Sequence, residues 1–211
     1  MKKVQDSNSA AALIPNKATL ENLRAAVRNC HACDLWKNAT QAVFGEGKAG
    51  AKIMLIGEVP GNQEDIEGKP FVGPAGKLLD AALAKAGIDR TEVYVTNTVK
   101  HFKFEPRGKR RIHQKPNAAE IAACRPWLDA EIGVVKPRII VCLGATAAQA
   151  LMGRDFRVTQ RRGEFLQSEL APIVIATVHP SSILRIPDEQ AKREEVKRFI
   201  ADLRKIRKAA K

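Results

Sequence analysis

Long apolar runs, cysteines and aromatic residues are all scarce in this sequence. Among its 211 residues, no apolar run approaches the roughly 18 that cross a bilayer, and no apolar core near the N-terminus is long enough for a secretory signal. Four cysteines are too few for a disulfide scaffold of this size. We therefore expect a cytoplasmic protein that acts as a monomer, rather than a membrane-spanning, secreted or fibrous one.

Acidic residues are also few compared with basic ones. Asp and Glu total 23 against 36 Lys and Arg, which gives a formal net charge of +13. Such an excess favours a polyanionic partner, with nucleic acid ahead of a membrane surface. The alternative is a basic surface that serves only solubility.

The four cysteines are spaced like metal ligands. Cys30 and Cys33 form a CxxC pair, while Cys124 and Cys142 stand apart from it and from each other. This arrangement is more typical of metal ligation in a reducing compartment than of disulfide bonding.

Strand-like and helix-like segments alternate along the chain. Short runs rich in Ile and Val, mostly continuous rather than alternating in polarity, lie at 52–56, 93–96, 138–143 and 173–178. Amphipathic segments that predict helices lie at 76–86, 117–132, 145–152 and 189–207. The alternation predicts an α/β fold with a loose tail at 1–17 and a single three-layer domain at 18–211, in which helices flank a central four-stranded parallel sheet.

In such a fold the ligand site lies at the carboxyl ends of the strands. Polar or glycine-rich loops follow all four predicted strands, as Gly57-Glu58-Val59-Pro60-Gly61, Thr96-Asn97, Gly144-Ala145 and His179-Pro180-Ser181-Ser182. After the second strand, residues 100–115 hold seven Lys or Arg and one acid. We expect an inserted basic loop at 101–115 that overhangs the strand ends and contacts nucleic acid.

These motifs occur in an order that resembles the uracil-DNA glycosylase superfamily. The set comprises Gly57-Glu58-Val59-Pro60-Gly61, the run Gly68-Lys69-Pro70-Phe71-Val72-Gly73-Pro74-Ala75-Gly76, then Val95-Thr96-Asn97 and His179-Pro180-Ser181-Ser182. The CxxC pair narrows the resemblance to the iron–sulfur branch, family 4. Within that branch, Lys109-Arg110-Arg111-Ile112-His113 resembles the UdgX type, which captures its product covalently.

The resemblance implies a role for each matching residue in binding uracil-containing DNA. Phe71 would stack on a flipped-out uracil, Asn97 would pair with its edge, and His179 would hydrogen-bond its O2. Ser181 and Ser182 would bind phosphate, Arg185 would reach the DNA backbone or fill the gap left by the base, and Gly57, Val59 and Gly61 would shape the pocket. The alternatives are a core phenylalanine, an asparagine that caps a turn, and a structural His-Pro.

For His113 the resemblance implies a nucleophile that attacks the sugar carbon C1′. Glu58 would orient its ring, and Arg110 or Arg111 would hold Glu58 and the loop. Lys109, Arg110 and Arg111 would also bind the DNA substrate. Val59 stands where the UdgX type usually has glutamine, which removes a polar contact from the capture site. The alternatives are a conventional, multiple-turnover family 4 glycosylase and a non-catalytic DNA-binding module.

The resemblance also implies a [4Fe–4S] cluster. Its ligands would be Cys30, Cys33, His101 and Cys124, with His101 standing where the family has a third cysteine. Cys142 lies inside a predicted strand, where a small buried thiol is common. Three thiolates and an imidazole would equally suit a structural zinc ion.

Overall fold

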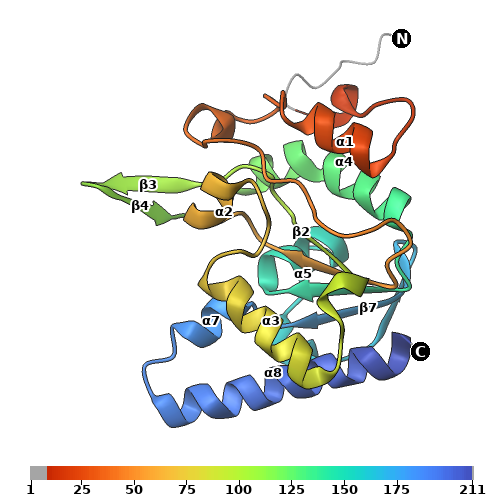
Figure 1. Ribbon diagram of the computed structural model, residues 1–211, viewed down its shortest axis with the longest axis vertical. Coiled ribbons are helices and arrows are strands. Elements are labelled where there is room, and N and C mark those ends of the chain that lie inside the picture. The colour runs from red at the N-terminus through yellow and green to blue at the C-terminus, as the bar shows by residue number, and fades with distance from the viewer. Residues whose placement is uncertain (1–8, 211) are drawn as a thin grey trace.

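A five-stranded β-sheet forms the middle layer of the computed structural model, which describes residues 9–210 (Figure 1). Its order is β2–β1–β5–β7–β6, with strands β1 (Ile53–Gly57), β2 (Val93–Asn97), β5 (Ile139–Leu143), β7 (Ala171–Thr177) and β6 (Leu166–Ser168). The first four are parallel, which confirms the predicted α/β fold and its parallel sheet. The antiparallel edge strand β6 escaped prediction because three residues with one apolar side chain carry no periodicity.

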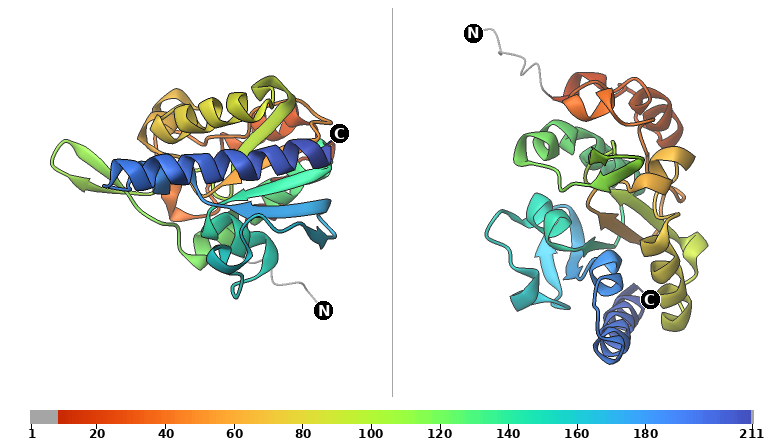
Figure 2. Two further views of the ribbon diagram at one scale, coloured as in Figure 1. Left: turned by 90° about the horizontal axis from the view of Figure 1, so that it is seen from below. Right: turned by 90° about the vertical axis from the view of Figure 1, so that its left-hand side faces the viewer.

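The helices cover both faces of the sheet. Their bounds are α1 (Leu20–Val27), α2 (Asn62–Glu67), α3 (Pro74–Ala86), α4 (Ala118–Val135), α5 (Ala145–Met152), α6 (Val158–Arg161), α7 (Pro180–Leu184) and α8 (Glu189–Ala210), and short 3-10 helices span Ala10–Leu13, Asp34–Lys37 and Arg90–Glu92. Helices α3 and α8 lie on one face of the sheet, and α4 and α5 lie on the other (Figure 2). Leu55 packs in the cluster that includes α3 and α8, whereas its neighbour Met54 packs in the cluster that includes α4 and α5. This alternation buries every residue of β1 and explains its continuous apolar sequence.

The segment before α1 differs from the loose tail that we expected at 1–17. Residues 1–8 lie outside the described part of the chain, but Ala10–Leu13 forms a 3-10 helix. Ala10 is completely buried in a third cluster, together with Leu23 of α1 and Trp127 of α4. Packing against apolar side chains of α1 and α4 therefore fixes the position of the last part of the predicted tail.

The expected basic loop at 101–115 is in fact largely a β-hairpin. Strands β3 (Phe104–Arg107) and β4 (Arg110–His113) pair antiparallel and project from the body of the molecule (Figures 1 and 2). Gly108 adopts a φ of 57° in the turn, a conformation that glycine adopts without steric cost. The pairing places Lys109 at the tip and His113 at the base, opposite Phe104.

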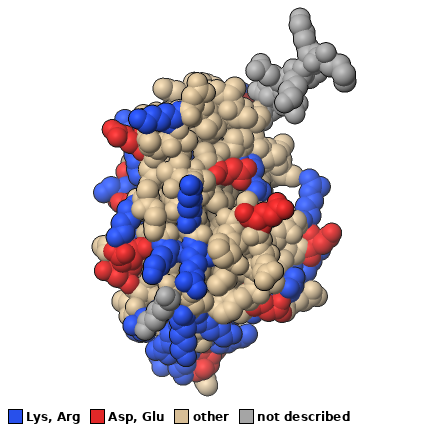
Figure 3. Space-filling view, turned by 90° about the vertical axis from the view of Figure 1, so that its right-hand side faces the viewer, with Lys and Arg blue, Asp and Glu red and all other residues tan. Residues whose placement is uncertain are grey.

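Positive charge is not confined to this hairpin. The last turns of α8 carry Arg204, Lys205, Arg207 and Lys208, and Lys and Arg side chains gather at the lower end of the face in Figure 3. Within residues 9–210, no helix is both long enough and apolar enough to span a membrane.

Candidate functional site

The main candidate site is a cavity of about 690 Å³ at the carboxyl ends of the parallel strands. Four side chains from distant parts of the sequence line it: Phe71, Asn97, His113 and His179. The predicted residues Val59, Gly61, Ser181 and Arg185 line it as well. The fold therefore brings together the motifs that sequence analysis singled out, from the end of β1 to the start of α7.

Close packing around Gly57 shapes one wall of the cavity. A Cβ atom at this position would lie 2.3 Å from Asn97 Oδ1 and 2.7 Å from Phe71 Cζ, so only glycine leaves room for both side chains. Phe71 itself has a φ of 57°, which is rare and costly for an aromatic residue. Gly76 accommodates that bend, since a Cβ there would lie 1.7 Å from the Phe71 carbonyl oxygen.

His179 is held at the start of α7 by the two serines that follow it. The Ser181 backbone N–H donates to His179 Nδ1 at 3.2 Å, and Ser181 Oγ lies 2.8 Å from the same nitrogen. Ser182 Oγ donates to the His179 carbonyl oxygen at 2.7 Å. Both hydroxyls therefore support His179, a role that the predicted phosphate contacts did not include.

Burial lowers the pKa of His179 to about 4, and the nearby His113 and Arg185 act in the same direction. The ring is therefore neutral at pH 7. Because Nδ1 accepts the Ser181 N–H, the ring proton is on Nε2. His179 can thus donate one hydrogen bond from Nε2 while its other nitrogen is engaged with the helix terminus.

A buried ion pair supports the backbone of Asn97. The Lys100 ammonium donates to the Asn97 carbonyl oxygen at 2.8 Å, to Thr96 Oγ1 at 2.7 Å and to Glu131 Oε2 at 2.5 Å, which satisfies all three of its donors. The side chains of Lys100 and Glu131 are both 0% exposed. Sequence analysis missed this pair because its members lie 31 residues apart, on different elements.

The remaining oxygen of Glu131 extends this network into the core. Glu131 Oε1 accepts hydrogen bonds from Tyr94 Oη at 2.9 Å and from the Gly45 N–H at 3.0 Å. Burial and the neighbouring carboxylate raise the pKa of Tyr94, so its hydroxyl stays protonated and keeps donating. The end of β2, which carries Asn97, is therefore fixed by a fully hydrogen-bonded polar cluster.

Arg111 anchors the hairpin on the body of the protein. Its guanidinium pairs with the buried Asp65 carboxylate at 2.6 Å and lies over the rings of Phe102 and Phe104, 5.3 and 5.1 Å from their centroids. The expectation that Arg111 holds Glu58 is therefore wrong, because Asp65 of α2 engages it instead. The anchor fixes the base of the hairpin, where His113 faces the cavity.

Glu58 is engaged elsewhere as well. Its carboxylate accepts a hydrogen bond from the Thr146 hydroxyl in the first turn of α5. In residues 9–210 no hydrogen bond joins Glu58 to His113, Arg110 or Arg111, so the predicted orientation of the His113 ring by Glu58 is not formed. Lys109 and Arg110 are exposed, as expected of side chains that contact a large partner.

One acidic residue of the cavity was not predicted. Glu64, in the first turn of α2, is only 8% exposed and accepts the Gly73 N–H at 2.8 Å. It thereby ties the loop that carries Phe71 to α2. Glu64 follows Gly61 by three residues, in the first turn of α2, where a carboxylate is favoured by the helix dipole. This pattern is a weak sequence signal that could have indicated Glu64 as a residue of the site.

Three of the predicted metal ligands belong to the third apolar cluster or pack against it: Cys30, Cys33 and Cys124. Cys30 Sγ accepts a hydrogen bond from Trp127 Nε1 at 3.2 Å, and Cys124 Sγ accepts one from the Lys100 N–H at 3.3 Å. Burial lowers the pKa of His101 to about 4, so its imidazole is neutral and able to ligate. These contacts resemble the hydrogen bonds that tune cluster-bound sulfurs.

The same side chains do not form a preorganised site for a single ion. Across the described chain, no three His, Cys, Asp or Glu side chains stand close enough together to hold one metal ion. This finding supports neither the zinc alternative, which needs four donors about 2 Å from one point, nor the expected [4Fe–4S] cluster. Cys142 lies apart in β5, buried within the sheet, in the strand position that we predicted for it.

Comparison with known proteins agrees with this geometry. Residues 44–204 match the uracil DNA glycosylase superfamily. The Type-4 uracil-DNA glycosylase of Pyrobaculum aerophilum is 39% identical over 175 residues, which are 80% of this chain and 86% of the relative. The Type-4 uracil-DNA glycosylase of Thermotoga maritima is 39% identical over 181 residues, 82% of this chain and 91% of the relative.

A Type-5 uracil-DNA glycosylase of Thermus thermophilus is 31% identical over 125 residues, which are 52% of this chain. The Type-4 relatives are therefore the more similar in sequence, at 39% identity. The superfamily match at 44–204 includes the loop after β1, the Phe71 loop, β2 and α7, which contribute residues to the cavity. The chain thus belongs to the uracil-DNA glycosylase superfamily and is of the family 4 kind.

Proposed function

We propose that this protein excises uracil from DNA and then captures the abasic sugar covalently on His113, as the UdgX type does. One observation carries the proposal: Phe71, Asn97, His179 and His113 line a single cavity. The names of the Type-4 relatives support the excision step. The net charge of +13 suits a polyanionic strand as the partner.

In the proposed excision step, a uracil that has been flipped out of the stack enters the cavity. Phe71 stacks on its face, and the Asn97 amide offers a donor and an acceptor to O4 and N3. His179 donates from Nε2 to O2, where negative charge builds as the glycosidic bond breaks. The neutral form of His179 suits this role, because Nε2 carries the proton to be donated and Nδ1 is already hydrogen-bonded to the Ser181 N–H at the start of α7.

In the proposed capture step, the C1′–N1 bond breaks and its electron pair leaves with uracil. A lone pair of the neutral His113 imidazole then forms a bond to C1′, and the resulting imidazolium loses its remaining N–H proton to solvent. The anchored base of the hairpin supports this role because Arg111 and Asp65 hold His113 at the cavity.

Conventional turnover is the second candidate, and two features favour it. The Glu58 carboxylate contacts Thr146 rather than His113, and Val59 offers no amide at the capture site. In that case water attacks C1′, and His113 only contacts DNA.

A uracil-containing oligonucleotide distinguishes these outcomes. Capture predicts free uracil together with an SDS-resistant protein–DNA band, and His113→Ser should lose the band while still releasing uracil. Gln114→Ser, at the residue that follows β4 and does not line the cavity, is the matched control and should keep both products. Uracil release without a band in the wild type would favour conventional turnover. No release at all would leave only a DNA-binding module.

We also propose that Cys30, Cys33, His101 and Cys124 hold a [4Fe–4S] cluster with a structural role. The hydrogen bonds to the Cys30 and Cys124 sulfurs and the neutral His101 imidazole support this set. Aerobically purified protein should contain about four irons per chain. Cys142→Ser should retain the iron, and Cys124→Ser should lose it. Iron lost from Cys142→Ser but kept in His101→Ala would contradict this ligand set.

A further inference from the structure

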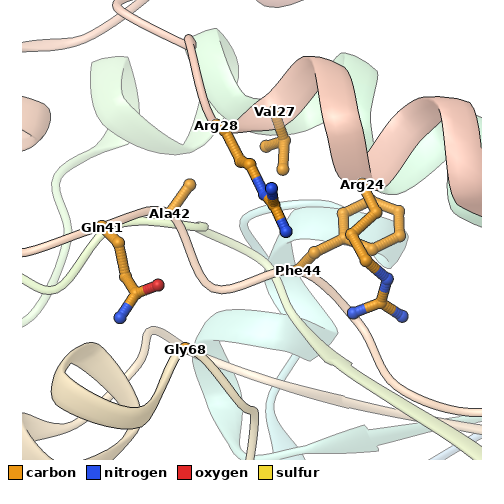
Figure 4. Close-up of a pocket in the computed structure, with 7 residues that line it drawn as sticks. All are labelled: Arg24, Val27, Arg28, Gln41, Ala42, Phe44 and Gly68. Carbon is orange, nitrogen blue, oxygen red and sulfur yellow. The ribbon is translucent and has the colours of Figure 1, made fainter.

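A second cavity, of about 390 Å³, lies between α1 and the segment 41–44 (Figure 4). Arg24 on α1 and Arg28, the residue that caps the C-terminus of α1, lie one helical turn apart and both line it. The lining also includes Gln41, Phe44 and Gly68 but no carboxylate. Two arginines therefore face an open space without any acid in its wall.

Arg24 is held in place before any ligand arrives. Its Nη2 donates to the Gly45 carbonyl oxygen at 2.9 Å, and its guanidinium lies over the Phe44 ring, 5.2 Å from the centroid. Arg28, in contrast, makes no hydrogen bond or ion pair with any residue from 9 to 210. Like charges four residues apart on a helix repel each other, so the free protein carries an electrostatic cost that an anion would relieve.

Gln41 and Gly68 form the wall of this pocket that lies opposite the two arginines. Gln41 Nε2 donates to the carbonyl oxygens of Asp65 and Ile66, both at 3.0 Å, which fixes its amide against the end of α2. Gly68 follows α2 with a φ of 71°. A side chain there would bring its Cβ within 2.6 Å of Gln41 Oε1 and would narrow the space below the arginines.

Helix α2 connects this pocket to the catalytic cavity. Its first residues, from Asn62 to Glu64, line that cavity, while its last turn contacts Gln41. A helix of this length spans about 9 Å, which a nucleic-acid strand covers in roughly three nucleotides. A strand whose uracil occupies the cavity therefore has the reach to place a phosphate between Arg24 and Arg28.

We propose that Arg24 and Arg28 form a phosphate-binding site, separate from the catalytic cavity. Guanidinium groups suit phosphate because they donate in pairs with fixed geometry and remain charged. The phosphate group belongs to the backbone of the substrate DNA strand, and this part of the proposal rests on the proposed function.

The test compares Arg28→Gln with Arg193→Gln, an exposed arginine of α8 outside both cavities. Affinity is measured for inorganic phosphate, for a trinucleotide with a central uracil, and for a 15-nucleotide strand with a central uracil. Arg28→Gln should weaken binding of the long strand roughly tenfold and lower its salt slope by about one, but leave the trinucleotide unchanged. Arg193→Gln should change none of these values. An unchanged melting temperature would show that the exposed Arg28 is not needed for folding.

Arg28→Gln could instead lose binding of inorganic phosphate while its affinities for the trinucleotide and the 15-nucleotide strand stay unchanged. That result would support the site, with a free phosphate group as its ligand. Equal behaviour of the two variants toward phosphate and the long strand would overturn the proposal. Uracil release by the wild type is scored separately on the 15-nucleotide strand. Its absence would refute the proposed function, while an Arg28-dependent affinity would still support the pocket.

Discussion

Replacing Glu131 with glutamine tests the buried network behind Asn97. Glutamine keeps the size of the side chain and an acceptor for the Tyr94 hydroxyl and the Gly45 N–H, so the main loss is the negative charge opposite Lys100. Because both side chains are 0% exposed, no solvent replaces that charge. The Lys100 ammonium would be left buried without a counterion.

Breaking one member of a buried pair costs about 3–5 kcal/mol, which is a large share of the roughly 5–15 kcal/mol that stabilise a typical domain. We therefore expect Glu131→Gln to lower the free energy of unfolding by about that amount in urea denaturation, with an unchanged m-value. The double variant Lys100→Met/Glu131→Leu removes both charges and should lose less than the sum of the single variants Lys100→Met and Glu131→Leu.

The network also predicts an effect on the site. Lys100 donates to the Asn97 carbonyl oxygen, so a displaced Lys100 should weaken binding of uracil-containing DNA more than it lowers the maximal single-turnover rate of uracil release. A Glu131→Gln protein that loses less than about 1 kcal/mol of stability and keeps its affinity for uracil-containing DNA would refute this reasoning, because the two charges would then have little energetic coupling to each other or to Asn97.

Three further outcomes follow from single contacts. Gly57→Ala should keep the fold but lower the single-turnover rate of uracil release by at least about tenfold, because its Cβ would lie 2.3 Å from Asn97 Oδ1. Binding of uracil-free DNA by the Lys109→Ala/Arg110→Ala double variant should show a flatter dependence of log affinity on log salt, and an unchanged slope would place the DNA elsewhere, such as on α8. Burial lowers the pKa of His179 from 6.5 to about 4, so between these pH values the unfolded chain binds more protons than the folded protein does. The folded state therefore has its full stability above pH 6.5 and loses the part contributed by the neutral His179 ring as the pH falls toward 4. Urea titrations at several pH values should show that His179→Gln weakens this dependence, and identical profiles would contradict a neutral buried ring.

The sequence predicted the parts of the molecule that depend on patterns among neighbouring residues. Continuous Ile and Val runs marked the four parallel strands, and the polar residues after them, such as Asn97 and His179, meet at one edge of the sheet as expected. The hairpin was missed because strands such as Phe104–Arg107, which contains a proline and two charged residues, have no alternating apolar pattern.

Partners of charged groups were the least predictable features. Glu58 was expected to orient His113 and to be held by Arg110 or Arg111, but it contacts Thr146, 88 residues away. Arg111 pairs instead with Asp65, 46 residues away. Such contacts depend on where the sheet places each loop, and a local motif does not contain that information. The packing of Ala10 against Leu23 and Trp127 escaped prediction for the same reason.

The most direct test of the account is mass spectrometry of the protein after reaction with a uracil-containing oligonucleotide and nuclease digestion. We predict free uracil in the supernatant and an added deoxyribose phosphate mass on the peptide that contains His113. An unmodified His113 peptide beside released uracil would contradict covalent capture. Intact uracil in the DNA would contradict excision itself.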